Sequence, residues 1–157
     1  MTQTRAFTQV LDQLKSVGLR PTRQRLALAK LLFEGGDRHV TAESLHGEAE
    51  NNRMRVSLAT VYNTLHQFTA AGLLREVVVA PGRSYFDTNR HDHHHFYHET
   101  TGELTDIPGD EVALSSLPTV PSGRRIARVD VVIRLADEDS ADASEEPGTA
   151  GEAFPAR

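Results

Sequence analysis

Apolar residues recur every three or four positions over the first 72 residues, as expected for amphipathic helices. The first apolar stripe, which stops at Gly18, consists of Phe7, Val10, Leu11, Leu14 and Val17. A second helix is predicted from about Thr22 to Glu34. Thr41 and Ser57 are typical N-cap residues and predict two further helices, the last of which ends at Gly72.

After the fourth helix the apolar period changes to two, which is typical of strands. Residues 73–80 and 83–88 form two extended runs joined at Pro81 and Gly82, a hairpin signal. Four helices followed by a two-stranded wing are the outline of a winged helix-turn-helix domain. We expect this domain to cover residues 1–88.

A second, smaller domain is predicted over residues 91–135. Residues 93–107 suit another hairpin, a short helix is expected around 110–117, and residues 126–135 alternate as a strand. One face of that strand carries Val129, Val131, Ile133 and Leu135, and the other carries Arg128, Asp130 and Arg134. The predicted fold class is therefore α+β, with a winged helix-turn-helix domain followed by a small α/β domain.

Charge is distributed unevenly along the chain. Residues 1–80 carry 10 Lys and Arg against 7 Asp and Glu, whereas residues 136–157 carry 1 against 7. The final segment has few large apolar residues and is predicted to be an acidic disordered tail. The basic N-terminal half is compatible with a nucleic-acid partner.

The chain contains no cysteine, which excludes disulfides, thiolate zinc sites and cysteine nucleophiles. No apolar run approaches the ~18 residues of a membrane-spanning helix, and the N-terminus lacks the apolar core of a signal peptide. We expect a cytoplasmic protein with no membrane partner.

The fourth predicted helix has polar groups away from its apolar stripe, of the kind that contact base edges and phosphates. These are Ser57, Thr60, Tyr62, Asn63 and Gln67. Three arginines near the start of the second helix add charge suited to phosphates: Arg20, Arg23 and Arg25. DNA binding is one hypothesis, and a solvated helix face beside an ordinary arginine cluster is the other.

Five of the eight histidines lie in the segment RHDHHHFYHE at residues 90–99. In a strand, His93 and His95 share one face, while His94 points to the other with Asp92. Candidates to complete the first pair are His39, Asp87 and Asp106, and the second pair has Asp110 and Glu111 nearby in sequence. Such sets suit Mn, Fe or Zn, and an exposed imidazole equally suits haem iron. No arrangement of nucleophile and general base accompanies the cluster, so an enzyme is not expected.

Several separated motifs, in order, resemble the ferric uptake regulator family of metal-dependent repressors. They are GLRPTRQR at 18–25, VSLATVYNTLHQFTAAGLL at 56–74 and PGRSYFDT at 81–88. The branch most similar is the haem-responsive iron response regulators, on the basis of DRHVTAE at 37–43, HHHFY at 93–97, TDIPG at 105–109 and IARVDVVIRL at 126–135. The resemblance covers most of the chain and excludes the acidic tail.

The resemblance implies a sensory metal site at His39, Asp87, His93, His95 and Asp106, and a haem-binding element at His93, His94 and His95. It also implies DNA contacts from the fourth helix and Arg20, and a homodimer formed through the second domain. The Cys-x-x-Cys pairs that hold structural zinc in typical members are absent here. Asn63 stands where the family usually has an arginine, which suggests a different operator preference.

The function expected from the resemblance is an iron- and haem-responsive repressor that binds operator DNA when haem is scarce and is inactivated by haem. The alternative is a repressor that uses Mn²⁺ or Fe²⁺ at the five-residue site as corepressor. A metal-storage module without a DNA role is a third hypothesis, which would be indifferent to replacement of Arg20 or Tyr62.

Overall fold

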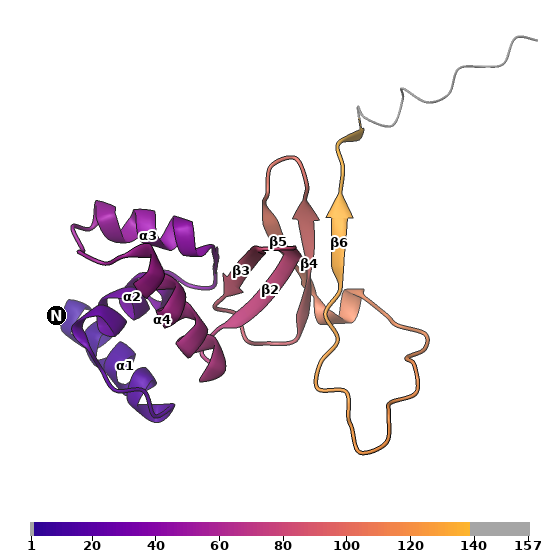
Figure 1. Cartoon of the computed structure of the whole chain (residues 1–157), viewed down its shortest axis with the longest axis horizontal. Coiled ribbons are helices and arrows are strands. Elements are labelled where there is room, and N and C mark those ends of the chain that lie inside the picture. Colours follow the sequence, from indigo (N-terminus) through magenta and orange to yellow (C-terminus); the bar gives the residue numbers. More distant parts are fainter. Residues whose placement is uncertain (1, 139–157) are drawn as a thin grey trace, which may run out of the picture. The chain divides into compact units, whose positions relative to one another are not determined.

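The computed structural model describes residues 2–138 (Figure 1). They fall into two compact units, the first ending at Asp92 and the second beginning at His93. Most of the predicted tail, residues 139–157, lies outside the described residues.

The helices of the first unit are α1 (Thr2–Ser16), α2 (Arg23–Phe33), α3 (Ala42–Asn51) and α4 (Leu58–Ala70). The N-cap predictions are confirmed. Thr41 and Ser44 form a reciprocal capping box at the start of α3, and the Ser57 side chain accepts a hydrogen bond from the Thr60 backbone N–H. These caps satisfy backbone N–H groups that have no partner within the helix.

The core of the first unit lies among the four helices and the strand that follows them. Its fully buried side chains include Leu14, Leu28, Leu32, Leu45, Val61, Leu65, Phe68 and Phe86. Phe7 belongs to the apolar stripe predicted for the first helix, but its side chain is not in the core and is 49% exposed. Phe7 instead lines an apolar hollow at the surface with Pro21 and Leu26, one helical turn beyond the buried part of the stripe.

A three-stranded antiparallel sheet completes the first unit, in the order β1-β3-β2. The strands are β1 (His39–Val40), β2 (Arg75–Ala80) and β3 (Arg83–Asp87). The predicted wing hairpin is confirmed, with Gly82 supplying the positive φ of 70° that its turn requires. The short strand β1 was not predicted, and it pairs His39 directly with Asp87.

The second unit contains a three-stranded sheet in the order β5-β4-β6, with β4 (His93–His98), β5 (Leu104–Pro108) and β6 (Val132–Leu135). Strands β4 and β5 are antiparallel, as predicted, while β6 pairs with β4 in parallel. The predicted helix at 110–117 is wrong. Only the 3₁₀ turn η1 (Gly109–Glu111) forms there, because Val112 leaves it in an extended conformation.

Strand β6 is shorter than its predicted range, and the side chain of Ile133 is exposed. Within the described residues, no helix combines the length and apolarity needed to cross a membrane.

Candidate metal centre and nucleic-acid interface

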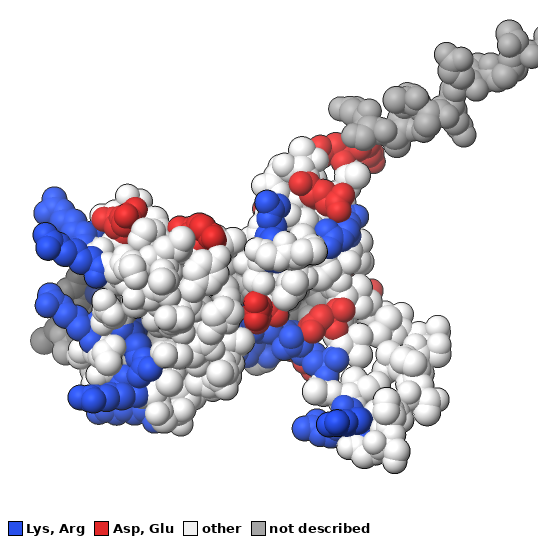
Figure 2. Space-filling view, in the orientation of Figure 1, with Lys and Arg blue, Asp and Glu red and all other residues white. Residues whose placement is uncertain are grey.

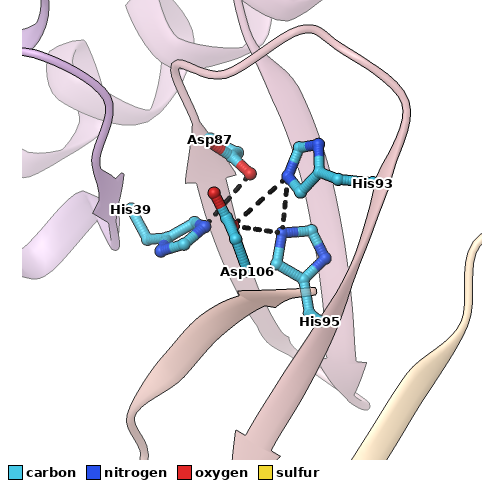
Figure 3. Close-up of side chains that lie close together, drawn as sticks. All are labelled: His39, Asp87, His93, His95 and Asp106. Carbon is cyan, nitrogen blue, oxygen red and sulfur yellow. Dashed lines mark hydrogen bonds and ion pairs between the residues drawn. The ribbon is translucent and has the colours of Figure 1, made fainter. Parts of the chain in front are cut away.

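The second unit brings two histidines and one aspartate together on one face of its sheet. Alternation along β4 buries His93 and His95, which are 5% and 3% exposed. Their Nε2 atoms lie 3.0 Å apart, and Asp106 Oδ1 lies 3.3 Å from each of them. Asp106 reaches this position because β5 pairs it with His95 (Figure 3).

Two Nε2 atoms this close have one of two arrangements. Either one nitrogen donates a hydrogen bond to the other, or the lone pairs of both point toward a common position where a cation can bind. A partly exposed carboxylate adjoins both of them, which adds negative charge at the same point. Two imidazoles and one carboxylate are the ligand set typical of non-haem iron sites with open positions. The donor chemistry of this group therefore fits a borderline-hard divalent metal ion.

The first unit holds a second group, a histidine paired with a buried aspartate. His39 Nε2 lies 3.1 Å from Asp87 Oδ2, which follows from the pairing of the two residues across β1 and β3. The Asp87 carboxylate is fully buried, and its Oδ1 accepts a hydrogen bond from the Asn89 backbone N–H at 2.8 Å. Each of the five residues in the two groups offers one nitrogen or oxygen atom to a metal.

The middle residue of the triple histidine has a different environment. His94 lies on the opposite face of β4, and its Nδ1 accepts a hydrogen bond from the Val131 backbone N–H at 3.1 Å. The three consecutive histidines therefore do not form one cluster. The sequence-based alternative that paired His94 with Asp110 or Glu111 has no contact to support it within residues 2–138.

Helix α4 presents most of the polar side chains predicted to contact DNA. Asn63 and Gln67 are exposed, while Thr60 and Tyr62 are half-buried. Ser57 has a structural task as the N-cap, so its hydroxyl is already engaged with the Thr60 backbone. The helix buries Val61, Thr64, Leu65 and Phe68, as its apolar stripe predicts except for Thr64.

The three predicted phosphate-binding arginines have different environments. The Arg25 guanidinium donates to Gln67 Oε1 at 2.8 and 3.2 Å and to the Arg20 carbonyl oxygen at 2.9 Å. Arg25 thus ties the start of α2 to α4. Arg20 and Arg23 are exposed.

The sequence-based reasoning missed Glu43, which lies in the first turn of α3. The Tyr62 hydroxyl donates to Glu43 Oε1 at 2.8 Å. This hydrogen bond lowers the pKa of the Glu43 carboxyl and raises the pKa of the Tyr62 hydroxyl. No sequence pattern links these residues, because the contact depends on how α3 crosses α4.

Arg38, the residue before His39, was also missed. Its guanidinium donates to the Glu48 carboxylate and to the Leu31 carbonyl oxygen, and its backbone N–H donates to the Thr88 hydroxyl. The hydrogen bond that Arg38 donates to the Glu48 carboxylate, more than the charge of that carboxylate, raises the pKa of Arg38. Arg38 therefore anchors β1 to α2, α3 and the segment after β3.

A family model, described as the ferric uptake regulator family, matches residues 16–131. The chain belongs to the ferric uptake regulator family. Members are transcription regulators rather than enzymes, so the expectation of a non-enzymatic regulator and the predicted fold class are confirmed.

Two curated proteins and one solved structure are similar to this chain over most of its length. The peroxide operon regulator of Bacillus subtilis is 36% identical over 66% of this chain and 73% of its own length. The peroxide-responsive repressor of Staphylococcus aureus is 32% identical over 62% of this chain and 65% of its own length. A structure of the ferric uptake regulator from Pseudomonas aeruginosa with manganese matches with a TM-score of 0.63 and 25% identity, over 81% of this chain and 96% of that one.

These comparisons confirm the resemblance at the level of the family. The two curated relatives are named for their response to peroxide, and the solved structure is described with manganese. Assignment to the haem-responsive branch remains a prediction.

Proposed function

We propose that this member of the ferric uptake regulator family is a repressor that binds operator DNA as a homodimer and uses Mn²⁺ or Fe²⁺ as its effector. The observation that carries the proposal is the buried pair of imidazole nitrogens, 3.0 Å apart, beside the Asp106 carboxylate. Burying two titratable rings against each other is unfavourable unless a proton or a cation holds them together. A divalent ion bound by all three side chains removes this penalty.

The proposed effector site unites the groups of the two units on one ion: His39, Asp87, His93, His95 and Asp106. Five residues separate Asp87 from His93, so their Cα atoms are at most about 20 Å apart in any arrangement. This short tether keeps the groups near each other and makes joint binding entropically inexpensive. When bound, Mn²⁺ or Fe²⁺ would supply a charge that neutralises both carboxylates, and Fe²⁺ would add sensitivity to oxidants.

In this proposal, regulation is a shift in the equilibrium between different arrangements of the two units. A ligand shifts such an equilibrium only through its different affinities for the two states. His39 and Asp87 add two donors in the arrangement where both units share the ion, so metal favours that arrangement. Coupling of about 1–3 kcal/mol, up to ~150-fold in DNA affinity, is typical.

We assign DNA binding to residues 1–88 and dimerisation and sensing to residues 91–135. The exposed side chain of Asn63 and the half-buried Tyr62 and Thr60 support base contacts from α4. In the second unit, four large apolar side chains are 38–50% exposed, which supports a self-association surface. They are Leu114, Leu117, Ile126 and Ile133.

Haem is the rival effector, held by the triple histidine. Haem iron takes an imidazole nitrogen as an axial ligand. The Nε2 atoms of His93 and His95 are instead buried and face each other. Peroxide is a second candidate signal, favoured by the two-histidine, one-carboxylate group and by the names of the relatives. It would act through oxidation of Fe²⁺ at the same five residues.

The test begins with duplexes selected from a random-sequence pool by the Mn²⁺-loaded protein. Fluorescence anisotropy then measures affinity with Mn²⁺, with a chelator, and with haem. We expect Mn²⁺ to tighten binding, the chelator to reverse this, and haem to have no effect. Failure to select any duplex, or an affinity indifferent to metal, would overturn the proposal, and release by haem alone would favour the rival.

A further inference from the structure

A basic hollow lies between the start of α2 and the turn that joins α3 to α4. Its volume is about 570 Å³, and three of its lining residues are Arg23, Arg53 and Arg55. Positively charged side chains gather on the helical end of the first unit, where Figure 2 shows the blue surface. The rest of the lining is polar or apolar and contains no acidic residue.

The three guanidinium groups lack protein partners among the described residues, in contrast with Arg25 and Arg38. The nearby acids of α3 are engaged elsewhere: Glu48 binds Arg38, and Glu50 lies 3.8 Å from His46. Three like charges around one hollow repel each other, and an anion relieves that repulsion. The charge of the hollow therefore favours an anionic ligand.

Arg53 adds a second observation. Its φ of 58° makes it the one residue other than glycine with positive φ within residues 2–138. Glycine or asparagine usually occupies such a position after a helix, because a larger side chain is strained there. A backbone outlier of this kind is a reason to look for a role of its side chain, and the Arg53 side chain lines the hollow.

We propose that Arg23, Arg53 and Arg55 form a phosphate-binding cleft that takes a backbone phosphate of duplex DNA beside α4. The proposal rests on the DNA-binding function proposed above. Arg55 comes two residues before the N-cap of α4, so the cleft flanks the end of the helix that we assign to base reading. Phosphates border the groove that such a helix enters, and contacts to them fix its register without reading sequence.

The experiment compares the salt dependence of DNA affinity for the full-length, Mn²⁺-loaded protein and single variants. Arg53→Gly removes the charge in a backbone conformation that glycine favours, so folding is retained. Arg55→Gln is the second variant. Arg124→Gln, at an exposed arginine of the second unit, is the matched control for loss of one charge.

We expect each cleft variant to weaken binding equally for selected and unrelated duplexes. The slope of log K against log salt should fall by roughly 0.9 per lost phosphate contact. The control should keep the wild-type slope. Cleft variants that match the control in slope and affinity would overturn the proposal.

A second arm separates this proposal from the proposed function. Pyrophosphate is titrated against each protein without DNA, with thermal unfolding as the readout. If the wild type binds no DNA yet is stabilised by pyrophosphate, and both cleft variants lose that stabilisation, the repressor function fails and the anion-binding cleft stands. If pyrophosphate stabilises wild type and variants equally, the cleft is wrong whatever the DNA result.

Discussion

The candidate metal centre has a first half, His39 and Asp87, and a second half, His93, His95 and Asp106. Both halves consist of histidine and aspartate, but the polar atoms of their side chains have different partners. In the first unit, one imidazole meets one carboxylate, and the other Asp87 oxygen accepts a backbone hydrogen bond, so the pair is complementary. In the second unit, two buried imidazoles face each other beside a carboxylate that is 37% exposed. A bound cation would therefore stabilise the second half more than the first half. We infer that the second half supplies most of the metal affinity and the first half supplies the response.

The first half is well placed to transmit that response to α4 within its own unit. Strand β1 leads through Thr41 into α3, where Glu43 holds the Tyr62 hydroxyl. Along β3, the residue before Asp87 is Phe86, whose ring meets His66 edge-on at 5.6 Å. His66 in turn stacks on Tyr62 at 6.3 Å. These contacts form a continuous path from His39 and Asp87 to α4, along which we expect a shift of either residue to act.

The largest expected effect comes from removing the second half. Replacing His93 and His95 together with alanine should lower Mn²⁺ affinity at least ~100-fold, since loss of even an outer partner typically costs 10–100-fold. Equilibrium dialysis measures this directly. His94→Ala is the control and should bind normally, and equal damage from that variant would break the distinction between the histidines.

Asp87→Asn tests the first half with little change in shape. The amide oxygen can still accept from the Asn89 N–H, but the charge that the ion needs is gone. We expect Mn²⁺ affinity to fall about tenfold and the effect of Mn²⁺ on DNA affinity to disappear. Anisotropy measures the second quantity, and a variant that still responds to Mn²⁺ would show that the first half transmits nothing.

Arg38→Ala should loosen β1 and so weaken the first half indirectly. Loss of its charge-assisted hydrogen bonds should lower the free energy of unfolding by about 1–2 kcal/mol, allowing for the partial exposure of the pair. Urea unfolding of the metal-free protein measures this free energy. Arg128→Ala, which removes an exposed ion pair with Asp130 in the second unit, should change stability by less than about 0.5 kcal/mol. Equal effects of the two variants would mean that Arg38 is not an anchor.

Glu43→Ala should have the smallest effect, up to about 1 kcal/mol, because the hydrogen bond to Tyr62 lies near the surface. The lowered pKa of Glu43 means that this stabilisation is present above its unfolded value of about 4.5 and is lost as pH falls through the folded pKa. The raised pKa of Tyr62 means that it is also lost as pH rises above about 10. The free energy of unfolding of wild type and variant, measured at pH 3, 7 and 10.5, shows whether the stabilisation is lost at both low and high pH. Tyr62→Phe should behave alike, and additive effects in the double variant would contradict the pairing.

The sequence predicted the elements of the first unit well, because its helices have regular apolar stripes, capping residues and a clear hairpin turn. It also grouped His93 with His95, since alternation along a strand depends only on local geometry. Their residue types also made His39, Asp87 and Asp106 candidate partners, and the resemblance to the family then implied that all three belong to the site.

The remaining features depend on contacts that local pattern does not encode. The Phe7 side chain follows the apolar stripe of α1, but the neighbouring helices leave it uncovered. Glu43 and Arg38 gained their importance from the crossing of α3 with α4 and from the two-residue strand β1. The helix expected at 110–117 failed because two serines and Pro118 limit its helical tendency, and no core contacts offset this.

The central claim is that metal and DNA favour the same arrangement of the protein. It is tested most directly by measuring Mn²⁺ affinity twice, without DNA and with a saturating amount of the selected duplex. Because coupling is reciprocal, we predict that DNA tightens Mn²⁺ binding by the factor with which Mn²⁺ tightens DNA binding, between about 5- and 150-fold. Equal Mn²⁺ affinity in the two conditions would contradict the account.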